Sequence, residues 1–147
     1  MADLKRILVP TDFTETSDRA LDWAIAMAAR LGASVTVMHA YEFPVIGFPD
    51  GAIMATPEIV SRIGEASRAA LDATLEKRQG SEVLIDGLMR EGVAWDVINS
   101  VADEIDADFI VIGTHGRRGL TRALLGSVAE NVIRTAHRPV ITIRGVS

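Results

Sequence analysis

Glycine and serine residues with a fixed spacing near the C-terminus form the part of this sequence best suited to chemistry. Gly113 and Gly116 are followed, after nine intervening residues, by Gly126 and Ser127. Glycines after a strand let the backbone approach a ligand without interference from a Cβ atom. A serine that opens a helix offers its hydroxyl beside unpaired N–H groups and the positive end of the helix dipole, an arrangement that suits phosphate. Taken alone, the same residues fit simple turns and a helix cap equally well.

The distribution of charge favours the phosphate interpretation of this segment. Residues 1–112 contain 9 Lys and Arg against 19 Asp and Glu, whereas residues 113–147 contain 6 Arg against the single Glu130. A basic segment within an acidic chain indicates that an anion is received there. The whole chain carries a net charge of −5 and its aromatic residues are scattered, which argues against a nucleic-acid partner.

A carboxylate near the N-terminus is the second candidate. Asp12 follows Pro10 and Thr11 directly after an apolar run. Aspartate at this point commonly stabilises a turn or caps a helix. It would face the glycine segment if the two strands that precede these segments are neighbours in the sheet, because ligands of parallel sheets bind beyond the strand ends where the winding reverses.

Other chemistries find little support. The chain has no cysteine, which excludes a disulfide framework and a thiolate metal site. The motifs of dinucleotide-binding folds and P-loop NTPases are absent. His39 is expected to be packed and hydrogen-bonded, and His137 to act as a cation at a helix end. His115 and Arg117 lie in the glycine segment, where contact with phosphate competes with simple solvation. We expect no metal site and no catalytic residue.

Alternation of short β-branched runs with longer segments of helical spacing predicts an α/β domain with a parallel sheet. Strands are predicted over residues 6–10, 34–40, 83–89, 108–113 and 139–143, and helices over 17–31, 57–78, 94–105 and 127–136. In the second helix, the residues expected to face the core are Ile59, Ile63, Ala66, Ala70 and Ala73. The economical strand orders are 2-1-3-4-5 and 3-2-1-4-5, and in the second the reversal falls between strands 1 and 4.

The length of 147 residues predicts one domain spanning 1–147. No apolar run is long enough for a membrane span and no leader pattern opens the chain, so we expect a cytoplasmic protein with no membrane partner. Residues 41–55 form a long predicted loop with two prolines and two glycines. Loops of that length usually have a function, such as covering a ligand.

Three segments of the chain resemble the universal stress protein family. They are the pattern G-x-x-G-x9-G-[ST] at Gly113, Gly116, Gly126 and Ser127, the opening ILVPTDF at 7–13, and LLGSVAENV at 124–132. The resemblance covers the chain from Lys5 to Arg144. It implies a five-stranded parallel sheet with helices on both faces, for which we expect the order 3-2-1-4-5, together with adenine nucleotide binding and homodimers.

By position, the resemblance also implies roles for individual residues. Asp12 would contact the ribose, the backbone around Ala40 would face adenine, and the glycine segment would surround the phosphates. The predicted nucleotide site comprises Pro10, Thr11, Asp12, Ala40, Gly113, His115, Gly116, Arg117, Gly126, Ser127 and Val128. The expected ligand is ATP or another adenine nucleotide, alone or with Mg²⁺.

Two functions follow from this interpretation. The first is a stress-response protein whose nucleotide acts as a signal for a regulatory or protective role, with slow or absent hydrolysis because no general base is evident near the phosphate segment. The alternative is a docking protein with a vestigial nucleotide site. In the order 3-2-1-4-5 the strand from Pro139 to Ile143 lies at an edge, and its apolar residues predict a homodimer formed by pairing of two such edges.

Overall fold

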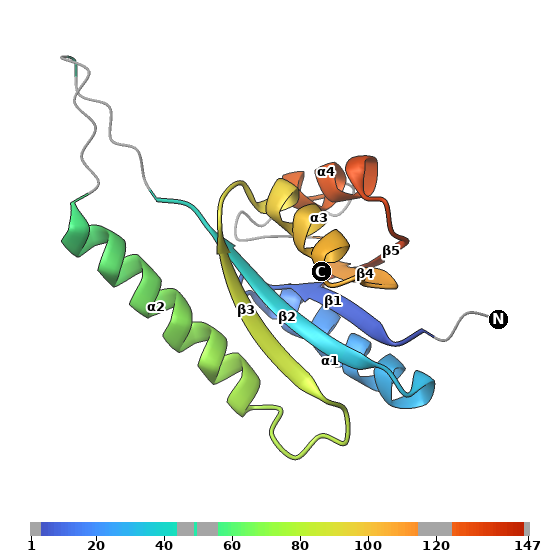
Figure 1. The fold of residues 1–147 in the computed structure, drawn as a ribbon. Helices are drawn as coiled ribbons and strands as arrows, with labels where there is room; N and C mark the ends of the chain where they lie inside the picture. The colour runs from blue at the N-terminus through green and yellow to red at the C-terminus, as the bar shows by residue number, and fades with distance from the viewer. Residues whose placement is uncertain (1–3, 44–48, 50–55, 115–124, 146–147) are drawn as a thin grey trace.

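Strands and helices alternate along the whole chain in the computed structural model, which describes residues 4–43, 49, 56–114 and 125–145 (Figure 1). The elements are β1 (Arg6–Pro10), α1 (Glu15–Leu31), β2 (Ser34–Tyr41), α2 (Pro57–Glu76), β3 (Ile85–Glu91), α3 (Ala94–Glu104), β4 (Phe109–Gly113), α4 (Ser127–Thr135) and β5 (Val140–Ile143). Among the described helices, none is both long and apolar enough to cross a membrane.

The five strands form one parallel sheet in the order β3-β2-β1-β4-β5, so the predicted order 3-2-1-4-5 is confirmed. The central strands are covered on both faces, as their apolar sequences predict: Ile7, Leu8 and Val9 of β1 are fully buried, and so are Ile110 and Val111 of β4.

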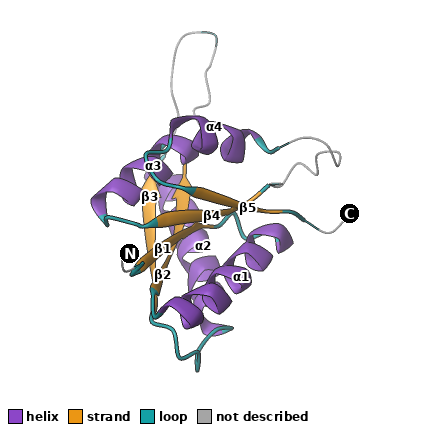
Figure 2. Cartoon of the chain, turned by 90° about the vertical axis from the view of Figure 1, so that its right-hand side faces the viewer, coloured by secondary structure: helices purple, strands orange, loops and turns teal. Residues whose placement is uncertain are grey.

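Two helices cover each face of the sheet (Figure 2). On one face, α1 and α2 pack over a core that includes Leu21, Ala24 and Leu71. On the other, α3 and α4 pack over a second core that includes Ile98 and Val132. This three-layer arrangement is the usual result of right-handed crossovers between parallel strands.

The first two helices have side-chain caps at their starts. Thr14 accepts a hydrogen bond from the Ser17 N–H at the start of α1, and Thr56 accepts one from the Ile59 N–H at the start of α2. Gly32 ends α1 in the left-handed conformation, with φ of 67°, as predicted for a glycine C-cap. Each of these two helices therefore has one of its first N–H groups bonded to the side chain of its own N-cap residue.

The structure corrects three details of the prediction. Strand β2 continues to Tyr41 and β3 runs two residues later than expected, because the two strands pair in register from Val35↔Ile85 to Tyr41↔Glu91. In α2, Ala66 and Ala73 are exposed, whereas Leu71 and Thr74 are buried. Two leucines of α2 use the space that Gly87 of β3 leaves: a Cβ there would lie 2.8 Å from Leu75 Cδ1 and 3.3 Å from Leu71 Cδ2.

Strands β1 and β4 diverge toward the carboxyl edge of the sheet. Their ladder contains only the pairs Ile7↔Phe109 and Leu8↔Ile110, although β1 continues to Pro10 and β4 to Gly113. The chain leaves β1 into a helix on one face and leaves β4 toward a helix on the other. A sheet that opens in this way provides a crevice beyond its strand ends.

Candidate functional site

A pocket of about 390 Å³ lies at the carboxyl edge of the sheet, on the face covered by α3 and α4. It is formed by the end of β2, the turn between β3 and α3, and the first turns of α3 and α4. The lining residues are Ala40, Glu42, Gly92, Val93, Ala94, Trp95, Ser127, Val128 and Asn131. A cavity of this size, with apolar walls and a few polar groups, can hold a small organic ligand.

Both helices that begin at the pocket lack a side-chain cap. Val93 precedes α3 and Gly126 precedes α4, and neither supplies a side-chain hydrogen bond to its helix. The first N–H groups of a helix have no partner within the helix, and they carry the positive end of its dipole. These helices differ in this respect from the threonine-capped α1 and α2. Within the described part of the chain, the first N–H groups of α3 and α4 have no N-cap side chain bonded to them, and such groups can bind an anionic ligand.

The backbone of Ala40 offers a donor and an acceptor at the same edge. In β2, Met38 accepts from the Thr11 N–H on the β1 side, and Tyr41 accepts from the Gly92 N–H on the β3 side. Peptide groups alternate along a strand, so the N–H and C=O of Ala40 point toward β1. Because β1 pairs with β2 only as far as Pro10↔Met38, both groups extend past the paired part of β1.

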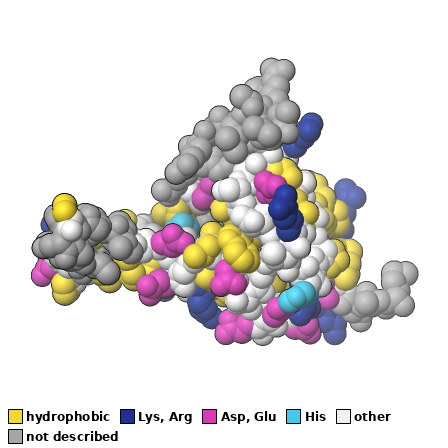
Figure 3. All heavy atoms as spheres, turned by 90° about the horizontal axis from the view of Figure 1, so that it is seen from above, with side chains coloured by type: hydrophobic (Ala, Val, Ile, Leu, Met, Phe, Trp, Pro, Cys, Tyr) yellow, Lys and Arg dark blue, Asp and Glu magenta, His cyan; other side chains and the backbone are white. Residues whose placement is uncertain are grey.

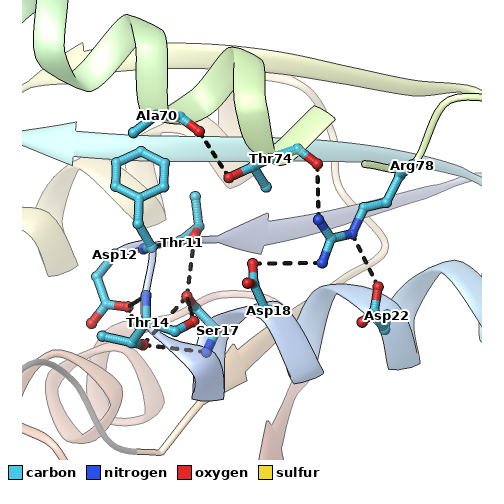
Figure 4. Close-up of polar contacts among 10 residues, drawn as sticks. Thr11, Asp12, Thr14, Ser17, Asp18, Asp22, Ala70, Thr74 and Arg78 are labelled. Carbon is cyan, nitrogen blue, oxygen red and sulfur yellow. Dashed lines mark hydrogen bonds and ion pairs between the residues drawn. The ribbon is translucent and has the colours of Figure 1, made fainter. Parts of the chain in front are cut away.

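The turn from β1 to α1 is held by its own side chains (Figure 4). Asp12 Oδ1 accepts hydrogen bonds from the backbone N–H and the hydroxyl of Thr14. The Thr11 hydroxyl lies 3.1 Å from that of Ser17 and accepts from the Phe13 N–H. Phe13 has φ of 66°, a left-handed conformation that is rare for a bulky residue. Asp12 therefore stabilises this turn, in keeping with the structural role considered from sequence.

His39 is packed and hydrogen-bonded, as predicted. Its Nδ1 atom lies 2.8 Å from the Thr11 carbonyl oxygen, and its ring centroid lies 4.4 Å from that of Phe13. The contacts connect the end of β2 to the turn that carries Asp12. His137, in contrast, is exposed and pairs with Asp103, with 3.2 Å between Nδ1 and Oδ2.

Of the predicted site residues, the structure brings Ala40, Ser127 and Val128 together in the pocket. Gly126 adjoins them as the residue before α4, and its N–H donates to the Thr114 carbonyl. Pro10, Thr11 and Asp12 end the neighbouring strand but are not among the lining residues. His115, Gly116 and Arg117 lie outside the described residues.

Gly113 has a packing function that the sequence did not indicate. A Cβ atom at this position would lie 2.8 Å from Thr16 Cγ2 and 3.2 Å from the Thr16 backbone carbon and oxygen. The glycine therefore permits close approach of the first turn of α1 to the end of β4, on the sheet face opposite to the pocket.

The basic surplus of the C-terminal segment is partly used elsewhere. Arg134 pairs with Glu130 along α4, and Arg138 pairs with Asp103 and Asp106. Hydrogen bonds from His137 and Arg138 hold the pKa of Asp103 below its ordinary value. Arg138 therefore joins α3 to the segment before β5, whereas the Arg134 pair lies within α4. The face seen in Figure 3 presents acidic side chains beside hydrophobic ones.

Sequence reasoning missed the contribution of the segment between β3 and α3. Gly92 has φ of 139°, and a Cβ atom there would lie 2.6 Å from Val97 Cγ2. Trp95 and Val93 add apolar surface, and Glu42 is the only charged side chain among the described lining residues. The available signal was Gly92 itself, because it lies at the carboxyl end of a strand, as Gly113 does, and parallel strands end at the same edge. Among the described residues, no group of His, Asp and Glu side chains could hold a metal ion.

Comparisons with known proteins agree with the fold described above. The family model described as "Universal stress protein family" matches residues 3–144. The chain is 36% identical over 142 residues to Universal stress protein MJ0531 of Methanocaldococcus jannaschii, covering 95% of this chain and 82% of the relative. Its fold is similar to the solved structure of protein MJ0577, with a TM-score of 0.83, 26% identity and 99% of each chain covered.

Two similar structures contain nucleotides. One is a universal stress protein in complex with cAMP, with 26% identity, a TM-score of 0.71, and 97% of this chain and 98% of that chain covered. The other is the universal stress protein from Archaeoglobus fulgidus in complex with dAMP, with 29% identity, a TM-score of 0.60, and 97% and 99% covered.

Proposed function

Because the chain belongs to the universal stress protein family, we propose that it binds an adenine nucleotide, with ATP as the expected ligand, at the carboxyl edge of its sheet. The observation that carries the proposal is the uncapped start of α4, where Ser127 and Val128 line the pocket directly after a glycine. Phosphate oxygens at this helix start would accept hydrogen bonds from N–H groups to which the N-cap residue, Gly126, offers no side chain.

The base of the nucleotide is assigned to the end of β2. Adenine carries an amino group that donates and a ring nitrogen that accepts on the same edge, which matches the C=O and N–H of Ala40. Guanine presents a carbonyl oxygen and a protonated ring nitrogen there. The same backbone pair would then place acceptor against acceptor and donor against donor, which disfavours guanine. The cAMP and dAMP complexes of the related proteins support an adenine ligand. The proposal includes ATP, and therefore three phosphates, bound alone or together with Mg²⁺.

The nucleotide is proposed to act as a signal for a stress-related regulatory or protective role, and not as a substrate for rapid turnover. Glu42, the carboxylate among the described lining residues, directly follows the end of β2, two positions after Ala40, and so belongs to the proposed base end. A hydrolase would need a base beside the terminal phosphate. Single-turnover hydrolysis at a rate of about 1 per second or faster would reclassify the protein as an ATPase.

The alternative function, a docking protein with a vestigial site, predicts no response to nucleotide. A ligand that binds only the folded state adds about 2.7 kcal/mol of stability at a hundredfold excess over its Kd. We therefore expect millimolar ATP or ADP to raise the Tm of the purified protein. An unchanged Tm, with and without magnesium, would contradict the proposal and favour the alternative.

Two substitutions at the start of α4 sharpen this test. Gly126 has φ of −60°, which any residue adopts, so Gly126→Val should fold while placing a branched side chain where phosphate is proposed to sit. Ser127→Ala removes one hydrogen bond to an anion, worth roughly 1.5 to 3 kcal/mol. We expect titration calorimetry to show no binding by the first variant and weakened binding by the second. Parental affinity in Gly126→Val would place the phosphates elsewhere.

The proposed assembly is a homodimer formed through β5. This strand pairs with β4 on one side and forms the edge of the sheet, and its residues Val140, Ile141 and Ile143 are only partly buried. An apolar edge strand of this kind readily pairs with another chain. Two copies related by a twofold axis would pair their edges antiparallel and cover these side chains.

A further inference from the structure

Thr114 has a buried hydroxyl group that lacks a hydrogen-bond partner in the described part of the chain. Its side chain is 4% exposed, and Oγ1 contacts neither a donor nor an acceptor. Every other buried hydroxyl group among the described residues is paired: Thr11 with Ser17, Thr36 with Asp86, and Thr74 with the Ala70 carbonyl. A buried polar group without a partner loses its hydration with nothing in return, so such groups are rare and call for an explanation.

The position of Thr114 associates it with the start of α4. Its N–H donates to the Ile143 carbonyl, and its C=O accepts from the Gly126 N–H. The backbone is therefore held on both sides, between β5 and the residue that precedes α4. Side chains alternate along an extended strand, and Ile110 and Ile112 belong to the core under α3 and α4. Thr114 is the first residue after β4, and its N–H still pairs with the end of β5. Two positions beyond Ile112, its side chain is therefore inferred to lie on the same sheet face, where α4 begins.

We propose that Thr114 is a ligand-binding residue whose hydroxyl donates a hydrogen bond to a phosphate group seated at the start of α4. The inference rests on the proposed nucleotide function and adds a side-chain donor to the backbone N–H groups of α4. Gly126 supplies no side chain to that helix start. A phosphate oxygen would satisfy the Thr114 hydroxyl and the N–H groups together, and hydrogen bonds to charged groups are stronger than those between neutral groups.

Thr114→Val tests this assignment because it removes the hydroxyl and keeps the shape of the side chain. The affinities of AMP, ATP and adenosine are measured by titration calorimetry, and Tm is measured without ligand. We expect AMP and ATP to bind roughly tenfold or more weakly, as for loss of a hydrogen bond to a charged group. Adenosine has no phosphate, so its affinity should not change. The Tm without ligand should stay level or rise, because an unsatisfied buried group is removed.

Three further variants provide controls. Thr114→Ser keeps the hydroxyl and should bind AMP as the parent does, and Thr114→Ala repeats the test if the valine variant fails to fold. Thr36→Val removes a buried hydroxyl that is already bonded to Asp86. It should lower the Tm and leave all affinities unchanged, which is the opposite pattern to that of Thr114→Val.

The outcomes separate this inference from the proposed function. If the parent binds AMP and ATP but Thr114→Val binds them equally well, the hydroxyl has no ligand role and the inference is wrong. Equal losses for adenosine and AMP would contradict it too, because the substitution would then act through the fold. If the parent binds none of these ligands, the proposed nucleotide function itself is refuted.

Discussion

Gly113 shows that a residue can belong to a ligand-binding pattern and act through packing. The pattern suggested contact with phosphate, yet the space left by its missing side chain is filled by Thr16 at the start of α1. That helix start follows the turn carrying Asp12, so Gly113 influences the site by allowing α1 to approach β4. The two residues of the pattern therefore act differently: Gly113 acts through packing, whereas Ser127 lines the pocket directly.

Gly113→Ala is expected to lower stability, because the added Cβ would overlap both the side chain and the backbone of Thr16. Overpacking of this kind typically costs about 1 to 3 kcal/mol. Gly64→Ala is a matched control, since a Cβ atom at this position of α2 would meet nothing within 4 Å. Replacing glycine by alanine inside a helix stabilises by roughly 0.5 to 1 kcal/mol. Denaturant unfolding should thus give opposite signs, and equal stability of the parent and Gly113→Ala would contradict the packing role.

At the scale of elements, α3, α4 and β5 are joined by a small charged cluster. Asp103 in the last turn of α3 contacts His137 and Arg138, which connect α4 to β5. Arg138 also donates to the Ala107 carbonyl and to Asp106. The hydrogen bond from His137, followed by that from Arg138, lowers the pKa of Asp103. The cluster fixes the approach to β5, and therefore the position of the edge proposed to form the dimer.

The lowered pKa of Asp103 predicts an acid-dependent contribution to stability. Because the folded pKa lies below the ordinary 3.8, the contribution is present above about pH 4 and is lost as the pH falls through the folded value. Asp103→Asn should therefore have a lower Tm than the parent at pH 7, and the difference should shrink toward zero below pH 4. Asp72→Asn, at an exposed position of α2, serves as the control. A Tm difference that does not change with pH would contradict this assignment.

At the scale of the whole molecule, the two edges of the sheet differ. The β3 edge belongs to a strand that packs against α2 through Gly87, whereas β5 is short and apolar. The carbonyls of Pro139 and Ile143 accept from β4 and the residue after it. By alternation, the peptide groups of Val140 and Thr142 point outward, where a second copy of the chain could pair with them.

Thr142→Pro is predicted to convert the proposed dimer into a monomer. Proline removes an outward N–H and leaves the ladder with β4 intact, which edge strands tolerate. Thr142→Val keeps the N–H and is the control. Sedimentation at micromolar concentration should give twice the chain mass for the parent and the valine variant, and the single chain mass for the proline variant. A monomeric parent, or a proline variant that remains dimeric, would contradict pairing through β5.

The sequence by itself determined the fold class, and it narrowed the strand order to two candidates, of which the one expected together with the family resemblance is the order observed. Local periodicity indicates which residues are buried, so the apolar strands β1 and β4 could be identified without coordinates. The start of α2 could be identified from its capping residues, Thr56 and Pro57. Part of the site could also be predicted: Ser127 from the local signs of a helix start, and Ala40 and Val128 from the family resemblance, and the three residues do meet in the pocket. Glycines 113 and 126 were recognised by spacing, which carries no information about what faces each one.

Only the tertiary structure showed which side chains from distant segments lie together. The contribution of Gly92, Val93 and Trp95 depends on the register between β2 and β3, which brings the turn after β3 beside Ala40. The buried face of α2 depends on the gap left by Gly87, and the engagement of Arg138 depends on the distance between α3 and β5. The orphan hydroxyl of Thr114 likewise became visible only from its surroundings. The physical reason is that long-range contacts follow from the combined packing of distant elements, whereas a sequence pattern reports mainly the local preferences of each.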